Sequence, residues 1–213
     1  MLSLSEHVDE IIKLDLAGRM KKVNFRKRKN GFWRETQSKG GQPTKVVQAI
    51  DVQVGGGQNT SEGIVTAKAG VFFLDLMPII TPWQKKAPSP VTANDCHVKM
   101  PIGLLGPWKN EGHTWPIGLD QTQDAVFAKE LADAVETWCV PYVEAALDLD
   151  KIAAGEVPGA DPYLMVLALQ RQGKKDAATA KVEEILAANP GRYMEVASFA
   201  GRLKLRAPPK PAK

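Results

Sequence analysis

The chain has few of the residues that hold metals, close disulfides or start catalysis. Its 213 residues include two cysteines, Cys96 and Cys139, and three histidines, His7, His97 and His113. Two thiols do not make a disulfide framework, so we expect plain buried cysteines in a reducing compartment. No pair of these residues has the spacing of roughly two to four residues that is typical of structural zinc sites. We therefore expect neither a metal nor a cofactor, and we assign no catalytic residue.

Long apolar runs are also missing. The longest, residues 71–80, is interrupted by Asp75 and Pro78 and is far shorter than the roughly 20 residues that cross a bilayer. The first residues lack the basic start and apolar core of a signal peptide. These absences predict a cytoplasmic protein with no membrane partner. A hydrophobic fraction of 44% and a charged fraction of 24% are ordinary for a globular domain.

A phosphate-binding loop is excluded as well. The glycines in residues 55–63 are not followed by Gly-Lys-Ser or Gly-Lys-Thr, and the next element is rich in β-forming residues. The segment is better explained as a connection between strands. Asp51 and Asp75 lie on neighbouring predicted strands, where a carboxylate pair is one interpretation and ordinary strand-end aspartates are the simpler one.

Positive charge is concentrated near the beginning of the chain. Residues 21–29 hold six lysines and arginines in nine positions, and Asn30-Gly31 follows them. Asn-Gly is the pair best able to take positive φ at both centres of a two-residue turn, so we expect antiparallel strands over about 23–29 and 32–37. The sequence thus predicts a basic hairpin with aromatic residues beside its cations.

Four residues of this hairpin are candidate binding residues: Arg26, Arg28, Trp33 and Arg34. Cations beside an aromatic ring suit single-stranded nucleic acid, whose bases stack on such rings. The same cations on an exposed strand also prevent edge-to-edge aggregation without any ligand. Residues 1–50 carry 11 basic and 5 acidic side chains, whereas residues 51–150 carry 6 and 13. The acidic middle segment is therefore a second candidate partner of the hairpin, within the fold.

The periodicity predicts an α+β fold in which an antiparallel four-stranded meander is packed by helices. Residues 4–20 have a helical apolar stripe with Gly18 at its end and His7 on its exposed side, and residues 45–54 alternate between a core face and a wet face. The prolines of residues 77–119 predict irregular structure. A helix follows to about Cys139, with its buried side at the following positions: Phe127, Leu131, Val135 and Trp138.

The last part of the chain reads as a helical hairpin extension. Asp161-Pro162 is a good cap and first-turn pair, and Gly173 would end the first helix. We expect an α+β domain over residues 1–155, the helical extension over 156–206, and a disordered tail over 207–213.

The motifs VNFRKRKNGFWRE, IDVQV, AGVFF and CHVKMPIGLL, the last followed by a tryptophan, together resemble the bacterial domain of unknown function 4304 family over about residues 5–145. The chain has residues 23–25 in place of the Gly-Phe that commonly opens the basic run, and Lys99 in place of the usual arginine after Cys-His-Val. The resemblance implies an α+β fold and supplies no activity and no catalytic residue.

Three functions follow as hypotheses. The first is a bacterial non-catalytic module that binds a protein partner, in the manner of immunity proteins that occupy the charged surface of a toxin. The second is a nucleic-acid-binding protein that uses the basic hairpin. The third is a hydrolase-like enzyme with a site at Cys96, His97 and His113.

Overall fold

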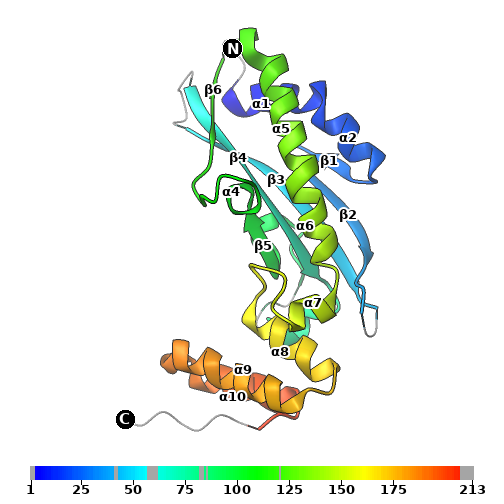
Figure 1. The fold of residues 1–213 in the computed structure, drawn as a ribbon, viewed down its shortest axis with the longest axis vertical. Coiled ribbons are helices and arrows are strands. Elements are labelled where there is room, and N and C mark those ends of the chain that lie inside the picture. Colours follow the sequence, from blue (N-terminus) through cyan, green and yellow to red (C-terminus); the bar gives the residue numbers. More distant parts are fainter. Residues whose placement is uncertain are drawn as a thin grey trace.

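In a computed structural model the protein is described over residues 3–40, 43–56, 62–81, 84, 86–119 and 121–206. An antiparallel sheet with helices forms its larger part (Figure 1), which confirms the α+β prediction. The predicted count of four strands was wrong, because the sheet has six. They are β1 (Arg26–Arg28), β2 (Gly31–Gln37), β3 (Lys45–Gly55), β4 (Glu62–Phe73), β5 (Val98–Pro101) and β6 (Trp115–Gly118).

The two extra strands come from the proline-rich segment that was expected to be irregular. β1 to β4 pair in chain order, and β4 then pairs β5 along one half and β6 along the other. Pro101 ends β5, and Pro116 lies in β6, which pairs only with β4 among the described strands. Proline is tolerated at these places because a strand end or an outer edge does not need its missing N–H.

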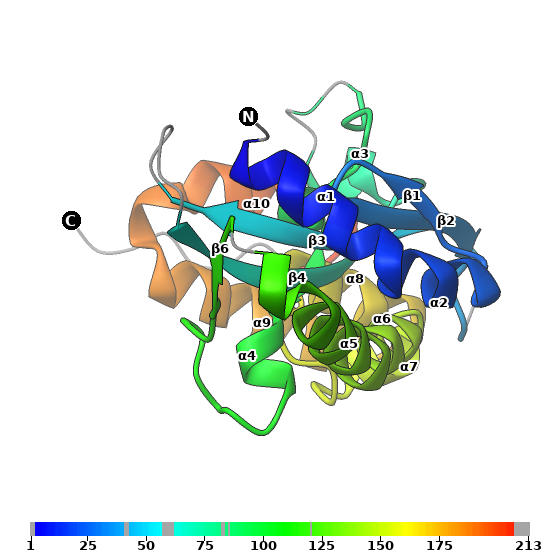
Figure 2. The same cartoon turned by 90° about the horizontal axis from the view of Figure 1, so that it is seen from above.

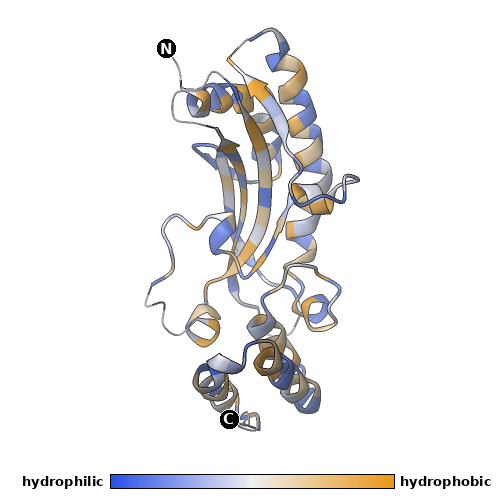
Figure 3. Cartoon of the chain, turned by 90° about the vertical axis from the view of Figure 1, so that its left-hand side faces the viewer, coloured by the Kyte–Doolittle hydropathy of each residue, from blue (hydrophilic) through white to orange (hydrophobic). Residues whose placement is uncertain are grey.

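One face of the sheet is covered by helices (Figure 2). They are α1 (Leu4–Leu14), α2 (Leu16–Lys22), α5 (Asp124–Ala134) and α6 (Val140–Ala145). Along the strands hydrophobic and hydrophilic residues alternate (Figure 3), and the predicted core set of β3 faces these helices. Gln48 shares that face and donates its Nε2 to the carbonyl of Val143 (2.7 Å). We call this side of the sheet the helix face.

The other face, which we call the second face, is only partly open. The segment after β4, with α3 (Met77–Ile80) and the short turn Ala93–Asp95, crosses it and buries Val47 and Ala49. The expectation that this side of β3 would be wet throughout was therefore wrong. Farther along the strand this side is partly open to solvent, and Asp51 and Gln53 are half-buried there.

Two helix predictions also need correction. The first helix breaks at Asp15, and Gly18 lies inside α2 rather than at its end. The long helix passes through a π-turn at Val135–Cys139 between α5 and α6. Each extra residue in a turn rotates the following side chains about the axis. Trp138, which was expected in the core, is consequently 36% exposed.

Beyond one end of the sheet lie the last helices (Figure 1): α7 (Leu149–Ala153), α8 (Pro162–Arg171), α9 (Lys175–Ala188) and α10 (Tyr193–Arg202). Asp161 caps α8 by accepting from the N–H of Tyr163 (2.8 Å), and Gly173 follows α8 with φ +75°. The helical extension is thus present as predicted. The predicted tail over 207–213 lies outside the described residues.

The loop before α8 is bonded to the sheet. Lys99 of β5 donates its N–H to the carbonyl of Gly159 (3.1 Å), and Val98 forms a β-bridge with Ala160. The helical extension therefore begins with a segment that continues the pairing of β5. The remaining short helix is α4 (Ile102–Leu105), which follows β5 directly. No helix of the described residues is both long enough and apolar enough to span a bilayer.

Candidate binding groove

The basic hairpin forms, but its turn is one residue earlier than predicted. Arg28 pairs with Gly31, so the two-residue connection is Lys29-Asn30, and Lys29 has φ +50°. Gly31 is the first residue of β2 and lies opposite Asp51 of β3. A β-carbon at position 31 would come within 2.6 Å of Asp51 Oδ1. Glycine therefore leaves room for the carboxylate, whose tip would have to shift if residue 31 carried a β-carbon, and the Asn-Gly pair was misread as the turn itself.

Strand alternation divides the cations of the hairpin between the two faces of the sheet. Lys27 and Arg34 point to the helix face. Lys27 makes an ion pair with Asp9 of α1, and Arg34 makes one with Glu144 of α6. The acidic elements of the fold thus neutralise two of the five cations of residues 26–37. The partner within the fold that the charge pattern suggested is therefore found for these two residues only.

Several groups of the fold bind the Arg34 side chain. Its guanidinium bonds to the Gln48 side chain and the carbonyl of Val23 (2.7 Å), and it lies over the ring of Phe25 at 4.5 Å. Its side chain is only 18% exposed. Among the four candidate binding residues, Arg34 is therefore the one that faces away from the other three.

Arg26, Arg28 and Trp33 lie together on the second face. Arg26 is directly across from Trp33, and its guanidinium lies 5.5 Å from the centre of the Trp33 ring. Both arginines are exposed, as is Lys29 in the turn. Within the described part of the chain, none of these three cations forms an ion pair. Their charge is available to a partner.

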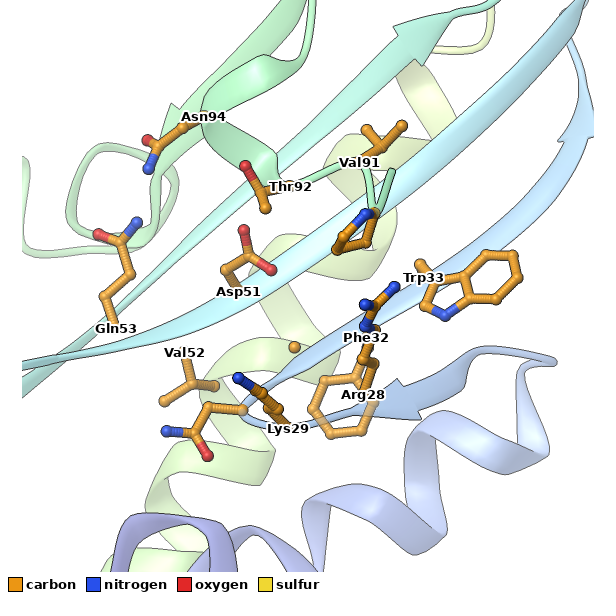
Figure 4. A pocket seen from close by; sticks show the side chains of 13 residues that line it. Arg28, Lys29, Phe32, Trp33, Asp51, Val52, Gln53, Val91, Thr92 and Asn94 are labelled. Atoms are coloured by element: carbon orange, nitrogen blue, oxygen red, sulfur yellow. The ribbon is translucent and has the colours of Figure 1, made fainter. Parts of the chain in front are cut away.

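Arg28, Lys29 and Trp33 form one wall of a groove with a volume of about 300 Å³, and Arg26 lies beside it over the Trp33 ring. Asp51 and Gln53 of β3 form its floor. The opposite wall is the segment that carries Thr92 and Asn94, and Figure 4 shows Asp51 between the two walls. The lining residues are Arg28, Lys29, Asn30, Gly31, Phe32, Trp33, Asp51, Val52, Gln53, Pro90, Val91, Thr92 and Asn94. The concavity is formed by the hairpin, the sheet and the covering segment together.

Asp51 lies in this groove but was not among the binding residues predicted from the sequence. It accepts the N–H of Ala93 (2.6 Å), which ties β3 to the opposite wall. Burial raises its pKa, because a carboxylate loses its hydration there. Asp75, which one interpretation of the sequence placed in a carboxylate pair with Asp51, instead accepts from the N–H of Lys45 (2.9 Å). The sequence signal that could have identified Asp51 is Gly31, but the strand register is needed to see that the two residues lie opposite each other.

The cysteines and histidines do not assemble a catalytic site. The Cys96 thiol bonds to the carbonyl of Thr92 (3.4 Å), and burial raises its pKa. His97 Nδ1 accepts from the N–H of Phe73 (3.0 Å), so this nitrogen is occupied within the core. His113 stacks on Trp108 with ring centres 3.9 Å apart. Within the described residues, no group of three or more His, Cys, Asp or Glu side chains could hold a metal.

His7 was expected on the exposed side of its helix and is instead buried, with 3% exposure. Its Nε2 lies 3.1 Å from Asp124 Oδ1, at the start of α5. The pairing explains the burial, since a buried imidazole needs a hydrogen-bond partner. His7 thus joins two helices of the helix face.

Comparison of the chain with protein-family models, with curated proteins and with solved structures found no match.

Proposed function

We propose that this protein is a non-catalytic binding module that takes an acidic surface of a partner protein against the second face of its hairpin. The observation that carries the proposal is the division of the cations. Lys27 and Arg34 have carboxylate partners inside the fold, whereas Arg26, Arg28 and Lys29 have none among the described residues. Protein interfaces are enriched in arginine and tryptophan, the residue types that lie together on this face.

The mixed charge of the groove favours a protein over a nucleic acid. Asp51 lies in the floor, and Glu35 and Asp95 are exposed on neighbouring segments. A continuous phosphate backbone would be repelled by these carboxylates, whereas a protein surface can place its acids beside the cations only. A bacterial immunity protein that occupies the acidic surface of a toxin is one module of this kind, and membership of the domain of unknown function 4304 family is part of the same proposal.

Nucleic acid is the second candidate, and the contact of Arg26 with Trp33 favours it. An arginine over an indole forms a flat cationic platform on which a base can stack. Against it, Arg34 is not available on that face. A hydrolase built on Cys96, His97 and His113 has no support from the geometry, because each side chain contacts a different group: the carbonyl of Thr92, the N–H of Phe73 and the ring of Trp108.

The test is affinity capture from extracts of the source cell with three forms of the protein. The wild type is compared with Arg26→Glu/Arg28→Glu and with a matched control, Lys174→Glu/Lys175→Glu, which makes the same charge change at exposed residues where α9 begins. We expect the same partner protein with the wild type and the control, and its loss with the hairpin variant. Equal capture by all three forms would overturn the proposal.

Nuclease treatment of the extract separates the two candidates. A protein partner is retained after treatment, and oligonucleotide binding to the purified chain is weak. If single-stranded oligonucleotides bind instead, with affinity that falls steeply with salt and is lost in the hairpin variant, the nucleic-acid function replaces the proposed one.

A further inference from the structure

The floor of the groove carries a carboxylate, that of Asp51, which has no ion pair among the described residues, although the charge of Lys68 acts on it. Lys68 lies directly across from it on β4, but its Nζ donates to Asn94 Oδ1 (2.9 Å). The Asp51 side chain instead accepts a hydrogen bond from the backbone N–H of Ala93. A half-buried carboxylate without a cation is costly to keep in a fold, and such a cost is found where a ligand supplies the missing group.

We infer that Asp51 is a recognition residue that accepts a basic side chain of the partner, a lysine or an arginine flanked by acidic residues. The inference deepens the proposed function and rests on it. Arg28 and Lys29 line the same groove and would repel an isolated cation. A base with acids on both sides matches the whole groove, because its acids meet the hairpin cations while its base meets the floor.

Close packing around Asp51 supports a fixed position for this carboxylate. Gly31 leaves room for Oδ1, and the Ala93 N–H holds the other oxygen. The bond comes from one wall of the groove and the free space from the other. A carboxylate that is held by a backbone N–H and faces a cavity is prepared for a hydrogen-bonded ion pair, which is stronger than a bond between neutral groups.

The probes are short, terminally blocked, fluorescein-labelled peptides of glutamates with either a central lysine or a central glutamine. Their affinities for the purified full chain are measured by fluorescence anisotropy at low ionic strength. We expect the lysine peptide to bind the wild type about tenfold more tightly than the glutamine peptide, as a charge-assisted bond implies. In Asp51→Asn, which keeps the size and the acceptor for the Ala93 N–H, this preference should vanish.

A second variant keeps the inference testable if Asp51→Asn does not fold. Asp51→Ala removes the carboxylate from the same floor and should likewise abolish the preference for lysine. Equal affinities for the two peptides in the wild type, or an unchanged preference in either folded variant, would overturn the role of Asp51. The proposed function fails separately, if neither peptide loses affinity in Arg26→Glu/Arg28→Glu.

Discussion

Gly31 lies directly across from Asp51, so closely that a β-carbon on residue 31 would sit 2.6 Å from the carboxylate. The relationship connects the turn of the hairpin to the floor of the groove. A side chain at either position limits what the other can be. The two residues therefore act as a unit, although 20 positions separate them in the sequence.

Replacing Gly31 by alanine should force Asp51 away from the Ala93 N–H. We expect a loss of about 1 to 3 kcal/mol in the free energy of unfolding, the usual cost of overpacking. Adding Asp51→Ala to the same chain should recover part of this loss, because the clash is removed. Urea unfolding of the four proteins of the cycle measures the coupling, and purely additive effects would contradict the contact.

The arginines of the hairpin should separate into structural and exposed residues. Arg34→Ala leaves the carbonyl of Val23 without its partner and leaves Glu144 only the longer pair with Lys39 (3.8 Å), so we expect a loss of about 2 kcal/mol in unfolding free energy. Arg26→Ala, on the exposed side, should cost at most about 1 kcal/mol. Chemical denaturation of both variants checks the difference. Equal losses would mean that the two faces are not as described.

The buried imidazole of His97 should make the fold sensitive to acid. Burial lowers its pKa from 6.5 to about 4, so the unfolded chain binds the proton more readily than the folded protein between these values. The stabilising contribution of neutral His97 is complete above pH 6.5 and is lost as the pH falls toward 4. The loss amounts to about 3 kcal/mol.

His97→Gln keeps a hydrogen-bond acceptor for the Phe73 N–H but cannot titrate. The free energy of unfolding of this variant should vary less with pH between 6.5 and 4 than that of the wild type. The comparison cancels the carboxylates that titrate in both proteins. Parallel pH profiles would show that His97 is not the group responsible.

Two glycines of the helical extension should respond oppositely to alanine. Gly173 has φ +75°, a conformation that strains an L-residue, so Gly173→Ala should lose about 1 kcal/mol. Gly201 lies within α10, where an added β-carbon meets no atom within 4 Å. Gly201→Ala should gain about 0.5 to 1 kcal/mol. Thermal unfolding of the pair tests both signs, and a stabilised Gly173→Ala would contradict the assigned helix end.

Local patterns predicted the elements whose signals are contained in a few neighbouring residues. The alternation of β3, the Asp161-Pro162 cap and the Gly173 helix end are of this kind. β5 and β6 were missed because they are short and contain proline, and they form only because β4 offers both of its halves for pairing. Their existence depends on tertiary contacts that no local window contains.

The prediction of the binding residues was also limited to what neighbouring residues in the sequence indicate. The basic hairpin was visible in the composition, and the alternation of side chains along a strand accounts for Trp33 and Phe32 lying on opposite sides of β2. The side on which Arg34 falls, and its partner Glu144, depend on where α6 packs. Asp51 was not recognised because its role arises from two contacts, Gly31 and Ala93, that are distant in the sequence.

The bond between Lys99 and Gly159, with the bridge beside it, has a consequence for any shortened form of the protein. A chain cut at the boundary expected near residue 155 would lose the cover of β5 and expose its backbone N–H and C=O groups. Uncovered strand edges pair with one another between molecules. Such a fragment should aggregate even if its helices and sheet still form, so the helical extension also serves as a guard against self-association.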